Sequence, residues 1–249
     1  MIRGLYTAAT GMVTESQRTD VIANNLANVN TVGYKKDETI STEFERTLLK
    51  RINDGQPIPD VGELGRGSMV EEIATTHDQC ATRQTGNPYD VAIAGTGYFA
   101  VQTAQGIRYT RNGAFTRSSD GELVTMSGQP VLDTNNRPIN IPDGKNVVIG
   151  SKGTIAVDGE DIGQLQFVQF TNDNRIMKVG DNLYQAADNE PTTAATGTIM
   201  QESLEMSNVN VVSEMVKLIN AYRAYEANSK AVVSQDSLLD KAVNQVGAV

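Results

Sequence analysis

Proline and glycine are distributed so unevenly along this chain that their positions alone limit the folds open to it. All seven prolines and 18 of the 22 glycines lie between residues 51 and 199. Proline costs about 3 kcal/mol in the interior of a helix, and glycine costs about 1 kcal/mol. Long helices are therefore possible at the two ends of the chain and disfavoured in its middle.

The N-terminal segment has the spacing of an amphipathic helix. One stripe follows alternating steps of three and four residues, which is the spacing of a heptad seam. Its members are Ile2, Leu5, Ala9, Met12, Ser16, Thr19, Ala23 and Leu26. The run ends in NVNTVG at residues 28–33, which supplies the asparagine and glycine common at helix C-termini. The pattern predicts a helix within residues 1–30.

The C-terminal segment continues the same alternation over more than five heptads. Its seam comprises Asn208, Val211, Met215, Leu218, Tyr222, Tyr225, Ser229, Val232, Asp236, Leu239, Val243 and Val246. Ser207, Asn208 and Asn210 offer N-cap oxygens near its start. About 38 residues would give a helix of roughly 57 Å. We expect this helix within residues 204–249.

Something must cover the apolar stripe of so long a helix. Pairing of the two terminal helices within one chain, a homodimeric coiled coil, and assembly of many copies all satisfy the periodicity. The asparagines at positions 24, 25, 28 and 30 leave a second alternative open. Buried asparagine fixes the register of partner helices, whereas asparagine at a helix end also serves turn chemistry.

The middle of the chain has the alternation and turns of β structure. Strand candidates lie at residues 91–94, 98–102, 107–110, 114–117, 122–126, 147–149, 154–157 and 165–170. Asn112-Gly113, Asp120-Gly121 and Asp158-Gly159 are hairpin signals. Turns about every ten residues predict an antiparallel sheet or small barrel.

The fold class is therefore α+β, with two terminal helices in a coiled-coil-like layer and a central, mainly antiparallel β domain. We expect five segments. They are an N-terminal helix (1–30), an extended linker (31–75), the β domain (76–179), a return linker (180–203) and a C-terminal helix (204–249).

Composition excludes several classes of function. A formal charge of −9 and a pI near 4.7 argue against a nucleic-acid binder. The single histidine and single cysteine leave too few ligands for the common zinc sites, and no internal disulfide is possible. The sequence contains no run of about 18 apolar residues, so we expect no membrane insertion. The N-terminus lacks the apolar region of a cleaved signal peptide. Lys35-Lys36 reads as a solvated pair.

Motifs for catalysis and cofactors are weak. Residues 95–100 fit G-x-G-x-x-A, but alternating sequence follows where a dinucleotide site needs a helix. His77 and Cys80 are spaced i, i+3, so a hydrolase that uses this pair is a remote alternative. No third residue orients them. We expect no enzyme activity, no cofactor, no metal and no small-molecule substrate.

Four runs of sequence carry a resemblance to a known family. They are MIRGLYTAATGM (1–12), DVIANNLANVNTVGYKK (20–36), TGNPYDVAIAGTGYFAVQTAQGIRYTRNGAFT (85–116) and LEMSNVNVVSEMVKLINAYRAYEANSKAV (204–232). In this order they resemble the bacterial flagellar rod and hook family. The opening run and the closing KAVNQVG (241–247) are more similar to the proximal rod protein than to the distal rod protein.

The resemblance implies a structural subunit of the flagellar basal-body rod, the axial tube that transmits torque. It implies partners among rod and hook subunits, including further copies of this chain. It also implies export through the flagellar type III apparatus without a cleaved signal peptide, and a place in the cell envelope, periplasmic where an outer membrane exists. A distal rod or hook-type paralogue is the alternative.

The two apolar seams would then form the assembly interface between subunits. The residues that we expect there are Leu5, Met12, Ile22, Asn25, Leu26, Asn28, Val211, Met215, Leu218, Tyr222, Tyr225, Asn228 and Val232.

Overall fold

The computed structural model of the chain describes residues 2–44, 47–50, 60–144, 146–187 and 191–246. Parts of the expected segments, namely residues 1, 45–46, 51–59, 145, 188–190 and 247–249, lie outside these described residues. The chain divides into two compact units. The first, here called the helical unit, comprises Met1–Ala27, Asp37–Thr75 and Asn210–Val249, and the second, the β unit, comprises Asn28–Lys36 and Thr76–Val209.

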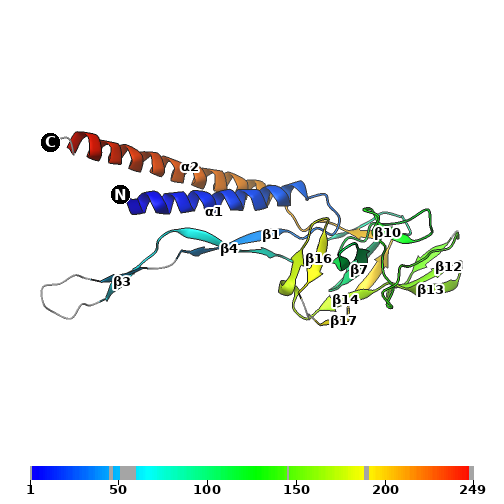
Figure 1. Cartoon of the computed structure of the whole chain (residues 1–249). Coiled ribbons are helices and arrows are strands. Elements are labelled where there is room, and N and C mark those ends of the chain that lie inside the picture. The colour runs from blue at the N-terminus through cyan, green and yellow to red at the C-terminus, as the bar shows by residue number, and fades with distance from the viewer. Residues whose placement is uncertain (1, 45–46, 51–59, 145, 188–190, 247–249) are drawn as a thin grey trace. The chain divides into compact units, whose positions relative to one another are not determined.

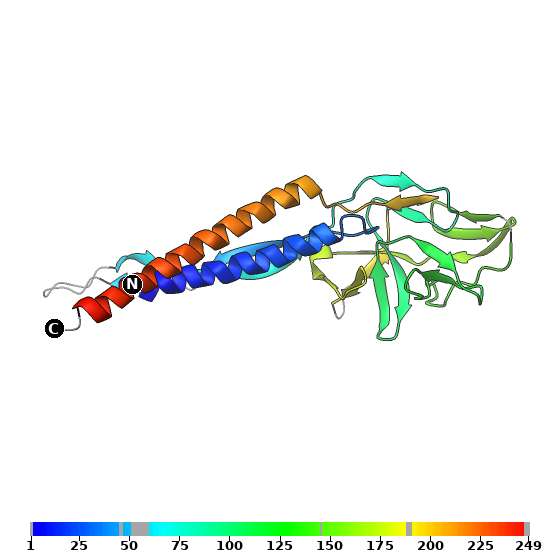
Figure 2. The same ribbon diagram turned by 90° about the horizontal axis from the view of Figure 1, so that it is seen from above.

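Two long helices dominate the helical unit, as the distribution of proline and glycine predicts. Helix α1 spans Ile2–Ala27 and helix α2 spans Val211–Lys241, followed by the short π-helical segment η2 at Ala242–Val246. The two helices run antiparallel and side by side (Figures 1 and 2). Among the N-cap candidates, Asn210 caps α2, because its side-chain oxygen accepts a hydrogen bond from the Ser213 backbone N–H at 3.0 Å.

Four strands between the helices complete the helical unit. Strand β1 (Asp37–Glu43) pairs antiparallel with β4 (Ser68–Thr75), and β2 (Thr47–Lys50) pairs antiparallel with β3 (Asp60–Leu64). Helix α1 packs on the first pair (Figure 1). There the Thr14 hydroxyl donates a hydrogen bond to the Ser68 carbonyl oxygen at 3.1 Å.

The β unit is built of antiparallel pairings throughout the strands that the structure describes. Its largest sheet has the order β15-β16-β8-β7-β14-β17, and a three-stranded sheet has the order β11-β12-β13. The remaining pairs are β9–β10, β6–β18 and β5–β19. The strand bounds are β5 Thr82–Gln84, β6 Val91–Ala94, β7 Tyr98–Thr103, β8 Gly106–Thr110, β9 Phe115–Arg117, β10 Leu123–Thr125, β11 Val147–Ile149, β12 Thr154–Val157, β13 Glu160–Gln164, β14 Phe167–Phe170, β15 Ile176–Lys178, β16 Leu183–Ala186, β17 Thr192–Ala194, β18 Thr198–Gln201 and β19 Ser203–Glu205, with a short 3-10 helix at Asp173–Arg175.

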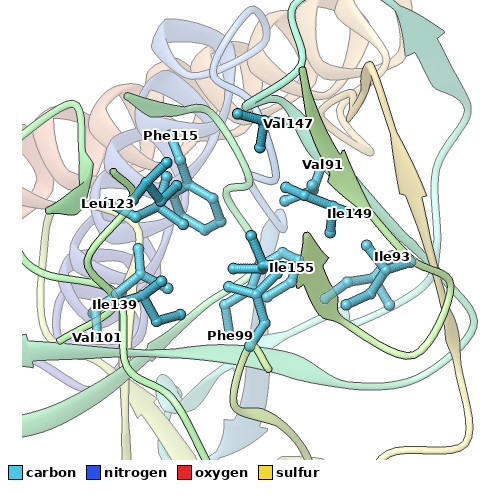
Figure 3. Close-up of a cluster of buried hydrophobic side chains, with 14 of the residues drawn as sticks. Val91, Ile93, Phe99, Val101, Phe115, Leu123, Ile139, Val147, Ile149 and Ile155 are labelled. Atoms are coloured by element: carbon cyan, nitrogen blue, oxygen red, sulfur yellow. The ribbon is translucent and has the colours of Figure 1, made fainter. Parts of the chain in front are cut away.

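One apolar cluster forms the main core of the β unit (Figure 3). It gathers β-branched and aromatic side chains from strands that are far apart in the sequence, which is how short strands with one apolar face reach burial together. Labelled members in the figure include Val91, Ile93, Phe99, Phe115 and Ile155. All five are at most 2% exposed. No side chain of α1 or α2 belongs to this cluster among the described residues.

Two of the three predicted hairpins are confirmed, and one is wrong. Asp120-Gly121 lies in the turn between the paired strands β9 and β10, and Asp158-Gly159 joins β12 to β13. Asn112-Gly113 separates β8 from β9, which do not pair with each other. Gly113 is instead required for packing, because a Cβ atom at this position would lie 1.7 Å from the carbonyl oxygen of Val91. The residue allows close backbone approach.

The G-x-G-x-x-A motif is a turn between strands, as its sequence context favours. Gly95 and Gly97 have φ values of +102° and +141° and connect β6 to β7. A strand follows the motif where a dinucleotide site requires a helix. The expectation that Lys35-Lys36 is a solvated pair is wrong for its first member, because Lys35 is only 1% exposed.

Candidate assembly surface

Three contacts between α1 and α2 involve glycine or polar side chains at heptad spacing. A Cβ atom on Gly4 would lie 3.3 Å from Gln235 Nε2, and one on Gly11 would lie 2.8 Å from Asn228 Nδ2. At the other end of the pair, Asn25 Nδ2 donates to Glu214 Oε2 at 3.5 Å. The first two contacts are seven residues apart on both helices, and the third is a further fourteen residues along, with the numbers rising on α1 and falling on α2. The register of an antiparallel pair is thereby fixed along its length.

Size complementarity explains why these residue types meet. Glycine leaves no side chain on α1 at positions 4 and 11, so the larger amides of Gln235 and Asn228 fit against its backbone. Ala221 lies between Asn228 and Glu214 at the same heptad position and is 2% exposed. Volume matching of this kind packs two helices closely without large apolar residues. Contacts at these positions therefore need no large apolar side chain from α1.

Several large apolar residues of α2 lie on its exposed side. Five of them at helical spacing form a continuous stripe, here called the outer α2 stripe. Its members are Val212, Met215, Val216, Ile219 and Tyr222, and each is between 48% and 72% exposed. Tyr225, 39% exposed, lies one turn beyond Tyr222. A contiguous apolar stripe exposed on a helix is a candidate interaction surface.

Helix α1 exposes a narrower apolar surface. Tyr6 and Val13 are 52% and 59% exposed and lie seven residues apart, on the same side of the helix. The small residues Ala9, Ser16 and Ala23 are also exposed and follow the same side of the helix. This face offers two projecting side chains separated by shallow positions. It differs in shape from the outer α2 stripe, which carries large side chains at successive turns.

Asn25 organises the end of α1 within the helical unit. Its side-chain amide donates to the Asp37 carbonyl oxygen at 2.8 Å, and its oxygen accepts from the Asp37 backbone N–H at 2.9 Å. The amide thus binds the first residue of β1 as a neighbouring strand would. Glu214, itself buried, adds α2 to this junction and accepts from Lys217 Nζ at 2.8 Å. Hydrogen bonding with Glu214 raises the pKa of Lys217.

The predicted interface residues are divided between these surfaces. Met215, Tyr222 and Tyr225 are exposed, whereas Ile22 and Asn25 are buried inside the helical unit. The remaining predicted positions are partly buried, and among these Asn228 contacts α1. They are Leu5, Met12, Leu26, Asn28, Val211, Leu218, Asn228 and Val232. Asn28 serves helix-end turn chemistry, because its side-chain oxygen accepts from the Thr31 hydroxyl at 3.1 Å.

Sequence reasoning missed several exposed residues. Val212, Val216 and Ile219 follow one another by four and three residues, so they form a second apolar stripe beside the predicted seam. Tyr6 and Val13 on α1 were missed for the same reason. A search for two adjacent stripes, in place of one seam, finds them.

His77 and Cys80 are engaged in the structure of the β unit. The Tyr98 hydroxyl and His77 Nδ1 are hydrogen-bonded at 2.8 Å, and the rings of His77 and Tyr98 meet edge to face. The Cys80 thiol donates to the Ser207 carbonyl oxygen at 3.1 Å. In the described part of the chain, no three acidic, histidine or cysteine side chains gather as metal ligands would. Nor does any helix there have the length and apolarity needed to cross a membrane.

Comparison with known proteins decides the family. A model described as flagella basal body rod protein matches residues 5–35, one described as flagellar hook protein FlgE/F/G D1 domain matches residues 92–157, and one described as flagellar basal body rod FlgEFG protein C-terminal matches residues 200–246. The chain is 38% identical to the flagellar basal-body rod protein FlgG of Bacillus subtilis (strain 168), over 98% of this chain and 99% of that protein. The chain belongs to the flagellar basal-body rod protein family.

Two further relatives of this rod protein align over their full length. The flagellar basal-body rod protein FlgF of Caulobacter vibrioides is 34% identical, and the flagellar hook-basal body complex protein FlhO of Bacillus subtilis is 32% identical. Both alignments cover 100% of the two chains. The family models match α1 and α2 as well as part of the β unit, so the rod protein shares both candidate assembly helices with its family. It is a structural protein of the flagellar basal body.

Proposed function

We propose that this rod protein is a proximal-rod subunit that assembles through the outer α2 stripe and the exposed face of α1. The observation that carries this proposal is the placement of apolar residues. The five residues of the outer α2 stripe stay 48–72% exposed although α2 packs against α1, so the helix pair does not cover them. Exposed large apolar side chains on a helix gain free energy when another subunit covers them.

The two exposed faces differ, which favours growth of a polymer over closed dimers. The outer α2 stripe is broad, and the α1 face around Val13 is shallow. A contact between unlike surfaces of two copies leaves one of each surface open, so a third copy can add in the same way. Partners include copies of this chain and other rod or hook subunits. Of the expected interface residues, Met215, Tyr222 and Tyr225 make direct contacts in this proposal, and the partly buried residues hold the helices that present them.

The alignments support a proximal position in the rod. The FlgF alignment has 251 positions for a chain of 249 residues, so it contains almost no insertions. The FlgG alignment from Caulobacter vibrioides, also 34% identical, has 258 positions and covers 96% of this chain. That FlgG therefore carries residues for which this chain has no counterpart. A distal rod or hook-type paralogue remains the second candidate, favoured by the 38% identity to the Bacillus subtilis FlgG.

Export in an unfolded state and a place in the cell envelope belong to the same proposal. The chain has one cysteine, so no internal disulfide obstructs the threading of the unfolded chain. Folding of the β unit around its own core, separate from the helices, would let it form after passage while α1 and α2 are still free to join the growing end.

Site-specific photo-crosslinking in motile cells tests this proposal. A photoreactive amino acid replaces Tyr222 on the outer α2 stripe or, as a control, Met126, which is 73% exposed on the β unit. We expect position 222 to capture rod subunits in assembled basal bodies and to lose these products when rod assembly is blocked. Capture of hook subunits at position 222 would favour the distal alternative. An absence of products from assembled basal bodies would contradict assembly through α2.

A further inference from the structure

A buried cluster of charges lies in the β unit. Glu205, on β19, is 1% exposed. Its Oε1 accepts a hydrogen bond from Lys35 Nζ at 2.7 Å, and its Oε2 accepts from Arg111 Nε at 2.7 Å. The side chains of Lys35 and Arg111 are 1% and 4% exposed. One carboxylate therefore joins two cations that lie 170 and 94 residues from it in the sequence.

Further hydrogen bonds satisfy the same groups. Lys35 Nζ also donates to the Asp78 carbonyl oxygen at 2.7 Å, and the Cys80 backbone N–H donates to Glu205 Oε1 at 3.0 Å. Arg111 donates to the carbonyl oxygens of Gly95 and Gly97. Burial alone would raise the pKa of Glu205, but Arg111 and Lys35 outweigh it and hold the pKa below its usual value. The carboxylate is therefore ionised at neutral pH.

The cluster includes residues from each segment of the β unit that leads into the helical unit. The chain passes between the two units four times, after residues 27, 36, 75 and 209. Lys35 lies just before the second passage, Asp78 and Cys80 follow the third, and Glu205 precedes the fourth. The first passage opens the same short segment, Asn28–Lys36, that Lys35 ends.

Backbone and amide hydrogen bonds tie these segments to one another as well. Gly33 N–H donates to the Glu205 carbonyl oxygen at 2.8 Å, and Thr76 N–H donates to the Lys36 carbonyl oxygen at 2.9 Å. The Asn208 side chain accepts from Lys36 N–H at 2.7 Å and donates to the Thr76 carbonyl oxygen at 2.9 Å. Three segments that are remote in sequence are thus held as one piece.

We propose that the Lys35–Glu205–Arg111 cluster is a clamp that resists force, because it holds together the chain segments through which force passes between the β unit and the helices. The clamp rests on the contacts above, and its load rests on the proposed rod function. A buried ion pair adds little net stability compared with an apolar replacement. Its hydrogen bonds are directional, however, and two of them to one planar guanidinium or carboxylate fix orientation as well as distance. Fixed orientation is what a joint under torque requires.

Hydrogen exchange of the full-length purified protein tests the clamp. Lys35→Met keeps an unbranched side chain that is only one atom shorter and leaves Glu205 paired with Arg111, so the β unit should fold. Lys152→Met is the control, because Lys152 is exposed on the same unit and the charge change is identical. Glu205→Gln provides a second, stronger perturbation of the clamp.

In Lys35→Met we expect amides of residues 31–36, 76–80 and 203–209 to exchange about ten- to a hundredfold faster, which corresponds to loss of hydrogen bonds to a charged group. Amides of β6 and β7 should retain their protection, and Lys152→Met should match the unaltered protein. Unchanged exchange in both Lys35→Met and Glu205→Gln would overturn the clamp. Equal acceleration in the core strands would overturn it too, since the cluster would then contribute only to general stability.

Swimming speed against medium viscosity tests the load. Cells that carry Lys35→Met should swim like Lys152→Met cells in dilute medium and lose speed more steeply as viscosity rises. Superimposable curves, together with accelerated exchange at the segment ends, would overturn the role of the clamp under force while leaving the clamp itself. Failure of the unaltered gene to restore swimming to a deletion strain would instead contradict the proposed rod function. This strain carries no substitution, so its result is independent of the clamp.

Discussion

An aspartate on the outer α2 stripe should block assembly without unfolding the subunit. Val216, 51% exposed on α2, and Val148, 47% exposed on β11, form a matched pair, because the residue type and the exposure are nearly the same. Val216→Asp and Val148→Asp therefore make the same chemical change on two different surfaces. Only the first surface is proposed to contact another subunit.

The expected magnitude follows from the exposure. Burying a whole Val side chain is worth about 1.5–3 kcal/mol, so covering the exposed half of Val216 contributes about 1 kcal/mol. A carboxylate forced into an apolar contact adds a desolvation cost of several kcal/mol. The total loss of about 3–5 kcal/mol corresponds to at least about a hundredfold weaker assembly. In the isolated subunit the same change costs only about 0.5 kcal/mol, because the position is exposed.

Three measurements check this prediction together. Thermal unfolding of the purified variants should show that both fold, with Val148→Asp losing up to about 1 kcal/mol for aspartate in a strand. Swimming in soft agar and recovery of the protein in purified basal bodies should be lost in Val216→Asp and retained in Val148→Asp. Normal incorporation of Val216→Asp, or equal loss in both variants, would refute the assignment of the outer α2 stripe to assembly.

The remaining predictions concern the helix seam, acid stability and catalysis. Gly11→Val should weaken α1–α2 packing by about 1–3 kcal/mol, because its Cβ would lie 2.8 Å from Asn228 Nδ2. The helical circular-dichroism signal should be lost at a lower temperature, and adding Asn228→Ala should restore much of the lost stability. Because the pKa of Glu205 is lowered in the folded protein, its contribution to stability is complete above the ordinary value of 4.5 and is lost as pH falls through the lower folded value. The melting temperature should therefore fall in this acid range. In Glu205→Gln the melting temperature should depend less on pH in the same range. His77→Ala and Cys80→Ser should leave motility unchanged, whereas lost motility with normal protein levels would indicate chemistry at this pair.

Elements with a strong periodic signal were predictable from the sequence. Helices α1 and α2 follow from heptad spacing and from the absence of proline, and most strands of the β unit follow from alternation between turn residues. The inner face of α2 did not follow. The predicted seam includes Met215 and Tyr222, whereas their neighbours Glu214 and Ala221 are the buried residues. Hydrophobicity identifies apolar side chains, whereas Gly4 and Gly11 select partners by available space.

The charge cluster was beyond sequence reasoning altogether. Lys35 stands beside Lys36 in a polar segment, and nothing nearby distinguishes it from a surface lysine. Its partner Glu205 lies 170 residues away, on the far side of the whole β unit in the sequence. Long-range pairing of this kind is created by the fold, so a single sequence carries no local sign of it.

The contact of α1 with α2 through glycine and amide groups has a consequence for how a cell handles this protein. The folded subunit keeps the outer α2 stripe exposed to water. If this stripe binds other subunits as proposed, copies synthesised in excess would associate with one another before they reach the rod. The rate of synthesis would then have to match the rate of assembly.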